Sequence, residues 1–436
     1  MKDKKIGNLI MKNVLPSVGG MMMVSLYILF DTIIVGQGIG KEGLAALNIG
    51  LPIYNLIFGT GILLGTGSGA YMSMSRGRNN IEDGEKSVLH SLVIGVTIGI
   101  IYTIIGFLFL EKIAMFLGAN DNNIMLVKEY LGSIIIFIPS FLMVYNLSIL
   151  VKHENRAKLS MIAMGAGGIT NVILDYIFVF PLGMGMKGAG IATGIASIVS
   201  LLILLTHFKS REIKVDFKKF RFDKIIFKAI VVIGFGSFII EISSGIAIFL
   251  FNRKLLEVIG EIGVSSYSII SNMSLMVVAI FTGICQGILP SISHDYGSGK
   301  HEGIKDIVKV GRVLALGVGL LFIIIGYLFP DKISAIFTKD WSEILDVTKE
   351  GISLYFLAFP IMGLNLIQIS YLQGTGRGKR ATWLSLCRGI IFIIIFINIL
   401  PIILGVKGIW LSIVVSEITV CCIFLLLGKN KKLSKA

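Results

Sequence analysis

Charged residues are scarce in this sequence. Only 15% of its 436 residues are Asp, Glu, Lys or Arg, whereas 55% are hydrophobic. A soluble globular domain carries about 25% charged residues, and a disordered chain has little apolar content, so both classes are excluded. Cysteine is scarce too: Cys285, Cys387, Cys421 and Cys422 all fall in apolar runs, with neither a disulfide framework nor metal-ligand spacing. The composition indicates a chain solvated mainly by lipid.

Long apolar runs recur along the chain. A bilayer core about 30 Å thick requires on the order of 20 apolar residues per helix, because every backbone group must be paired within the helix. The first run is too long for a secretory signal, contains Asp31 and lacks a small-residue cleavage site, so we expect it to be retained. The sequence thus predicts an all-α integral membrane protein with twelve transmembrane helices, at residues 14–35, 48–74, 88–110, 130–151, 159–180, 188–207, 229–251, 264–291, 309–329, 351–373, 381–402 and 408–428.

The positive charge is distributed unevenly around these spans. The formal net charge is +14, and counting Lys and Arg by connection places 29 on the side of the N-terminus and 10 on the opposite side. The positive-inside rule therefore predicts a multi-pass protein of the inner (cytoplasmic) membrane with both termini in the cytoplasm. The densest basic cluster, at 208–228, is interpreted as a linker that touches anionic headgroups, and no nucleic-acid partner is expected.

The sequence matches itself at a shift of 220 to 222 residues, so that, for example, Gly61 corresponds to Gly283. Each half holds six spans, and an even number gives both halves the same orientation, as parallel repeats. We predict an N-terminal six-helix bundle with a cation site at 1–207, a basic cytoplasmic linker at 208–228 and a C-terminal six-helix bundle at 229–436. Two such bundles can enclose a central cavity that opens to each side in turn.

Five charged residues fall well inside the predicted spans, where each costs roughly 2.5–3.5 kcal/mol to insert. Two of them, Asp31 and Asp175, reach a similar depth in the first bundle, and Tyr27 and Asn171 precede them by four residues on the same helix faces. Two carboxyl groups in one buried site can retain a proton at neutral pH. The oxygens of Asp31, Asn171 and Asp175 equally suit a sodium ion, and the sequence does not choose between the two ions.

A purely structural role for the two aspartates is the alternative interpretation. The internal repeat argues against it, because Asp31 corresponds to Asn252 and Asp175 corresponds to an isoleucine at 394–396. The same scaffold is therefore built in the second half without either acid.

The other three buried charges lie in the second half. Glu241 is close to the middle of its span, where it suits either contact with a cationic substrate or hydrogen bonding to Ser243 and Ser244. Arg388 and Glu417 lie in neighbouring spans and are expected to form a buried structural ion pair.

Four stretches carry a resemblance to a known family: Pro16 with LYILFDTIIVGQGIG at 26–40, ENRAKLSMIAMGAGGITNVILD at 154–175, GMKGAGIAT ending at Thr193, and GTGRGKRA at 374–381. Over essentially its whole length the chain resembles the multidrug and toxic compound extrusion (MATE) transporters. The resemblance implies two six-helix bundles arranged as a V around a central cavity and a first-helix bend at Pro16. It also implies a cation site at Asp31, Asn171, Asp175 and Thr193.

The resemblance further implies a secondary active multidrug efflux transporter, not an enzyme. Such proteins export bulky, cationic, amphipathic compounds in exchange for protons or sodium. The implied partners are small organic cations and the lipid bilayer; no cofactor is expected beyond the coupling ion, and a monomer is the family expectation. In one branch of the family, acids of the second bundle also take part, and Glu241 lies in the seventh span where one such acid sits. This chain departs from that pattern in the tenth span, where Asn365 and Gln368 are the polar residues and no carboxylate is present. The departure argues against a second cation site.

Several apolar and aromatic residues could line an adaptable cavity, although ordinary packing or contact with lipid is the better explanation for most of them. With Glu241, the candidates are Met161, Met273, Phe141 and Tyr145. Pro16, Pro139 and Pro360 mark expected helix bends, which suit hinges or static bends.

Three rival functions fit the sequence less well. A flippase for a lipid-linked sugar shares this architecture but needs a cationic cavity, and Arg388 is the one cation well inside the predicted spans. A membrane enzyme would need grouped catalytic residues, whereas the five histidines are scattered at span ends. A channel would need a filter loop or a charged ring, and nothing in the sequence resembles either.

Overall fold

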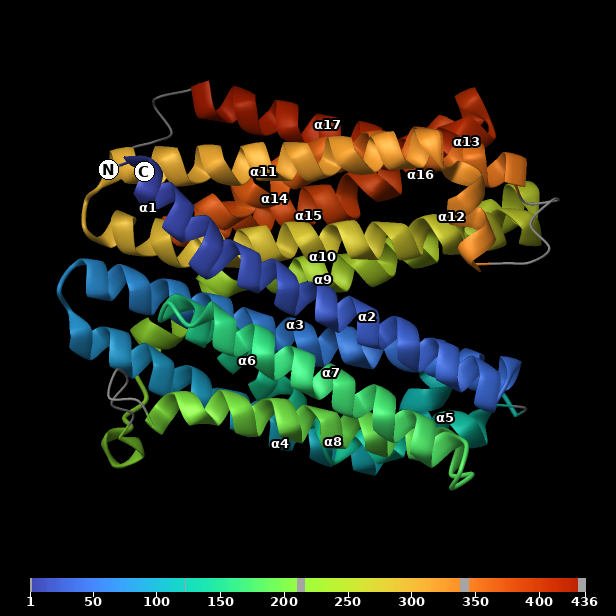
Figure 1. Cartoon of the computed structure of the whole chain (residues 1–436), viewed down its shortest axis with the longest axis horizontal. Helices are drawn as coiled ribbons and strands as arrows, with labels where there is room; N and C mark the ends of the chain where they lie inside the picture. The colour runs from blue at the N-terminus through green and yellow to red at the C-terminus, as the bar shows by residue number, and fades with distance from the viewer. Residues whose placement is uncertain (1, 122, 210–215, 338–344, 430–436) are drawn as a thin grey trace.

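The chain folds into two groups of helices that lie side by side (Figure 1). A computed structural model describes residues 2–121, 123–209, 216–337 and 345–429, and every regular element in these ranges is helical. The long helices of both groups run in roughly the same direction. Helix α1 and the end of α17 lie at the same end of the molecule, which we call the termini end (Figure 1).

The first group contains the helices before residue 206, of which the start, through Val14, packs against α10 (Glu261–Gly297) of the second group (Figure 1). They are α1 (Lys2–Leu9), a π-helical segment (Ile10–Val14), α2 (Leu15–Gly38), α3 (Lys41–Gly77), α4 (Ile81–Phe116), α5 (Ile124–Ile135), α6 (Ile138–His153), α7 (Ala157–Val179) and α8 (Gly185–Leu205). Two short 3-10 turns, Thr206–Lys209 and Phe217–Lys219, follow at the termini end. Residues 210–215 of the predicted linker lie outside the described residues.

The second group repeats this order. It contains α9 (Lys224–Ile259), α10 (Glu261–Gly297), α11 (His301–Leu328), α12 (Pro330–Phe337), α13 (Leu345–Tyr355), a 3-10 turn (Phe356–Ala358), α14 (Phe359–Gly374), α15 (Gly378–Leu386), a π-helical segment (Cys387–Ile391), α16 (Phe392–Leu404) and α17 (Val406–Lys429).

The helices are long and apolar enough to cross a membrane. Among the described residues, 11 helical stretches pass this test, and the pair α5 and α6, bent by 58°, supplies a twelfth. Each coincides with one of the twelve predicted runs, so the prediction of an all-helical membrane protein with about twelve spans is confirmed. Large apolar side chains such as Ile104, Leu108 and Ile402 remain exposed, as expected of a surface in contact with lipid.

Tight turns occur at matching places in the two halves. Gly40 and Gly260, 220 residues apart, have φ angles of 87° and 77° just before α3 and α10. Gly185 and Gly405 both have φ of 57°. Only glycine adopts this left-handed region without strain, so the backbone conformation of the turns is repeated with the sequence.

Candidate functional site

A cluster of polar side chains lies in the core of the first helix group. Asp31 on α2, Asn171 and Asp175 on α7, and Thr193 on α8 all have exposed fractions of 7% or less. Asn171 and Asp175 share one face of α7 because they are four residues apart, and α7 packs against both α2 and α8. The Asn171 Nδ2 donates a hydrogen bond to Thr193 Oγ1 at 3.2 Å.

The two carboxyl groups lie together. Asp31 and Asp175 are within hydrogen-bonding reach of each other. Four oxygens here, Asp31 Oδ1, Asn171 Oδ1 and both carboxylate oxygens of Asp175, accept no well-aligned hydrogen bond from a donor of the described residues, although the Asn171 side chain lies close to the Asp175 carboxylate. Buried oxygens without donors are costly, and a proton or a hard cation such as sodium would satisfy them. The donor set therefore fits either ion.

Tyr27 connects this cluster to the middle of the molecule. It lies on α2 four residues before Asp31, near both carboxyl groups and close to Tyr145 on α6. Tyr145 in turn is close enough to Glu241 on α9 for the two groups to interact electrostatically. A row of polar groups thus extends from the acid pair to the second helix group.

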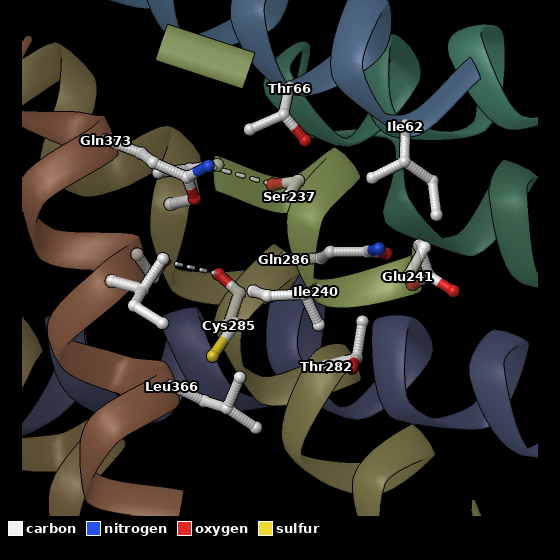
Figure 2. A pocket seen from close by; sticks show the side chains of 13 residues that line it. Ile62, Thr66, Ser237, Ile240, Glu241, Thr282, Cys285, Gln286, Leu366 and Gln373 are labelled. Atoms are coloured by element: carbon white, nitrogen blue, oxygen red, sulfur yellow. Dashed lines mark hydrogen bonds between the residues drawn. The ribbon is translucent and has the colours of Figure 1, made fainter. Parts of the chain in front are cut away.

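A pocket lies where the two helix groups meet (Figure 2). Its volume is about 50 Å³, with Ile62 and Thr66 of α3 on one wall and residues of α9, α10 and α14 on the others. Glu241 lines the pocket. The hydroxyl groups of Ser243 and Ser244 donate to backbone carbonyls, 3.0 Å from Ile240 O and 2.8 Å from Glu241 O. Neither serine is therefore committed to the Glu241 carboxylate.

Comparisons with known proteins identify the family. The sequence profile of the MatE family matches residues 16–177 and 234–400, one stretch in each half of the chain. The chain belongs to the MatE family. Members of this MATE family are multidrug efflux transporters of the membrane and not enzymes, as the sequence predicted.

Individual MatE relatives cover nearly the whole chain. The multidrug export protein MepA of Staphylococcus aureus (strain MRSA252) is 24% identical over 408 residues, which is 92% of this chain and 89% of MepA.

The fold is that of solved MATE structures. An outward-facing MATE family transporter of the MOP superfamily superposes with a TM-score of 0.90 at 23% identity, covering 97% of this chain and 94% of that one. A point mutant of the Vibrio cholerae MATE transporter VcmN superposes with a TM-score of 0.91 at 19% identity, covering 100% and 98%.

The predicted cavity residues lie in different surroundings in this MatE chain. Glu241 lines the described pocket. Phe141 and Tyr145, with exposed fractions of 4% and 7%, pack inside the first helix group. Met161 packs against Gly19 and Gly20 of α2, and Met273 packs against the core of the second group.

The three predicted bend prolines all lie in the first turn of a helix. Pro16 begins α2 after a π-helical segment, Pro139 begins α6 beside the 58° bend, and Pro360 begins α14 after a 3-10 turn. At Pro139 the missing N–H costs little, because the first turn of a helix leaves its N–H groups without partners. Pro16 and Pro360 instead lie within the continuous helical stretches Ile6–Gly38 and Leu345–Gly374, where the helix changes from π or 3-10 to α.

The predicted ion pair of the second half is confirmed. Arg388 Nε donates to Glu417 Oε1 at 2.7 Å, and Asn365 Nδ2 donates to Glu417 Oε2 at 2.7 Å. Glu417 is 1% exposed and Arg388 is 9% exposed. All the carboxylate oxygens of this pair thus have donors, unlike those of Asp31 and Asp175.

Sequence reasoning missed one buried cation. Lys152 falls one residue beyond the predicted fourth span and was counted with the flanking charges, yet α6 continues through it and its exposed fraction is 3%. Its Nζ donates to Oε1 of Gln286, which lines the pocket on α10. No local signal reveals this contact, because Lys152 and Gln286 are 134 residues apart.

Proposed function

We propose that this chain is a secondary active antiporter that exports cationic amphipathic compounds in exchange for protons or sodium. Both termini are cytoplasmic in this proposal, and the functional unit is the single chain. The observation that carries it is the buried pair Asp31 and Asp175, whose oxygens lack well-aligned donors and which Tyr27 and Tyr145 connect to the pocket carboxylate of Glu241.

Exchange follows if the ion and the substrate favour different packings of the first helix group. An ion at the acid pair removes the penalty of the unpaired oxygens and so stabilises the arrangement that buries them. Substrate bound at Glu241 stabilises an arrangement in which the pocket, about 50 Å³ in this structure, is wide enough to hold it. Each ligand shifts the equilibrium only by its differential affinity for the two states. Tyr27 and Tyr145 lie between the ion site and the substrate site, so a change in packing at one site is felt at the other.

Asp31→Asn and Asp175→Asn test this coupling. In everted membrane vesicles, we expect each variant to lower gradient-driven export of a cationic dye at least tenfold, because the amide can neither release a proton nor supply a negative ligand. Asp121→Asn, at an exposed residue between α4 and α5, is the matched control and should export normally. Normal export by either buried variant would refute the proposal.

The coupling ion is identified in the same vesicles. Collapse of the proton gradient or removal of sodium, applied separately, should abolish wild-type dye export in one case and spare it in the other. Indifference to both treatments would favour a channel or a lipid-linked sugar flippase. Against a flippase, the described residues that line the pocket include Glu241 but no lysine or arginine.

A further inference from the structure

Lys152 occupies an unusual position for a lysine. It lies near the end of α6 in the first helix group, is 3% exposed, and reaches across the interface to α10 of the second group. Its only hydrogen bond to a described side chain is to a neutral amide oxygen, Gln286 Oε1. A buried ammonium is expensive unless it is paired, so a neutral partner beside a substrate pocket requires an explanation.

The contact fixes the orientation of the Gln286 amide. A lysine ammonium has N–H donors and no acceptor, so the amide atom that faces it must be the oxygen. The amide NH2 group of Gln286 then points away from Lys152. Because Gln286 lines the pocket, this NH2 is available to a bound molecule, and Figure 2 shows the amide directed toward the side of the pocket where Glu241 lies.

Two other polar side chains of the pocket, which is also lined by the hydroxyl groups of Thr66 and Thr282, are engaged within the protein. Gln373 Nε2 donates to Ser237 Oγ at 2.8 Å, and Ser370 Oγ donates to the Cys285 carbonyl at 3.3 Å. The pocket therefore offers a carboxylate at Glu241 and an oriented donor at Gln286 as two distinct groups.

We propose that Lys152 is a positioning residue that sets substrate specificity through Gln286. By holding the amide oxygen, it presents the NH2 group to a hydrogen-bond acceptor of the substrate while the cationic group of that substrate binds near Glu241. The preferred class is thus organic cations that also carry a carbonyl, ether or carboxylate oxygen. This inference rests on the proposed export function and adds the substrate class to it.

A simpler role for the contact is to fasten the two helix groups together. A fastening would act on every substrate alike, because each transport cycle would break the same bond. A positioning role changes KM only for compounds that carry an acceptor. The two roles therefore differ in a measurement that compares matched substrates.

Two phosphonium ions provide the comparison: tetraphenylphosphonium, which has no acceptor, and its derivative with one 4-acetyl group, which adds a carbonyl oxygen. In proteoliposomes that contain the full chain, wild-type protein should export the acetyl compound with a KM about tenfold lower, the effect of one good hydrogen bond. Lys152→Met should abolish this preference by raising the KM of the acetyl compound alone, with kcat and tetraphenylphosphonium export unchanged. Lys152→Arg, which retains the donors, should restore the preference.

Gln286→Glu is the second variant, and it tests the inference even if Lys152→Met fails to fold. It supplies Lys152 with a carboxylate partner but replaces the NH2 donor with an acceptor, so the preference should again disappear. Combining it with Lys152→Met should cause no further loss of preference, since Lys152 acts through this side chain.

The inference is overturned if wild-type protein has equal KM values for both compounds, if Lys152→Met retains the preference, or if it slows export of both compounds equally. Failure of wild-type protein to export either compound under a proton or a sodium gradient would overturn the proposed function itself. Retained export of tetraphenylphosphonium with no preference would overturn the specificity role alone.

Discussion

The buried charges in the two halves differ in what satisfies them. In the second half, each carboxylate oxygen of Glu417 accepts a hydrogen bond, one from Arg388 and one from Asn365. In the first half, both carboxylate oxygens of Asp175 lack a well-aligned donor among the described residues. A satisfied ion pair is suited to holding helices together, whereas unsatisfied acids are suited to binding an ion.

Glu417→Gln should therefore be destabilising. The free energy of unfolding is expected to fall by about 3–5 kcal/mol, because the Arg388 guanidinium loses its counter-charge in a buried site. Denaturation in mixed detergent micelles measures the change. Glu302→Gln, at an exposed ion pair with Lys305, is the matched control and should change the free energy by less than about 1 kcal/mol. Equal stability of Glu417→Gln and wild type would contradict a structural role for this pair.

At the scale of a helix, the bend between α5 and α6 is supported by a neighbouring side chain. Proline at 139 cannot donate a hydrogen bond to the carbonyl of Ile135, the acceptor one turn earlier in a helix. The Thr103 hydroxyl on α4 is shared between two carbonyl oxygens, at 2.9 Å from that of Gly99 in its own helix and at 3.1 Å from that of Ile135, so it supplies part of the missing hydrogen bond. Gly99, one turn before Thr103, brings α4 close: a Cβ there would be 2.8 Å from Pro139 Cα.

Thr103→Val tests this support. The substitution keeps the shape of the side chain but removes the hydroxyl, leaving a buried carbonyl unpaired, and should lower the free energy of unfolding by about 1–3 kcal/mol. Pro139→Ala restores an N–H at the bend, so Thr103→Val should cost less in that background. The free energies of unfolding of the two single variants and the double variant are measured by denaturation in micelles. Thr97→Val is the control, because the exposed Thr97 hydroxyl donates a hydrogen bond to Val93 O of its own helix. If Thr103→Val lowers the free energy of unfolding equally in wild type and in Pro139→Ala, then Thr103 does not compensate for the N–H that Pro139 lacks.

The same elements show how far sequence reasoning reaches. The twelve spans were predictable because each must present about 20 apolar residues to lipid, and the repeat was predictable because its glycines recur 220 residues apart. The acids Asp31 and Asp175 stood out against an apolar background, and the structure places them together. The contact of Lys152 with Gln286 was not predictable, because it depends on how two helices 134 residues apart pack. Helix ends were also missed: α3 begins at Lys41, seven residues before its apolar run.

For the whole molecule, the important contacts are those between the two helix groups near the termini end. Here α3 approaches α9 and α10 so closely that backbone meets backbone. A Cβ on Gly67 would lie 2.0 Å from the Ile230 carbonyl oxygen, and one on Gly234 would lie 2.0 Å from that of Leu63. Farther toward the termini end, a Cβ on Gly297 would lie 2.1 Å from Met74 O. With cytoplasmic termini, these contacts would seal the pocket from the cytoplasm.

Gly67→Val should weaken this seal. The added side chain has no space beside Ile230, and overpacking of about 1–3 kcal/mol would shift the ratio of closed to open states by about 5- to 150-fold. Spin labels at positions 82 and 302, exposed sites at the starts of α4 and α11, report the separation of the groups when the native cysteines are replaced by serine. Pulsed electron–electron resonance should show a longer distance in Gly67→Val.

Gly317→Val is the matched control for that experiment. In the part of the chain that the structure describes, no atom lies within 4 Å of a Cβ at Gly317 on α11, so the same substitution is accommodated there without moving the helix groups apart. Its distance distribution should match that of wild type. Unchanged distances in Gly67→Val would mean that the close approach of α3 and α9 does not control opening at the termini end. A longer distance in both variants would instead indicate a general effect of removing a helical glycine.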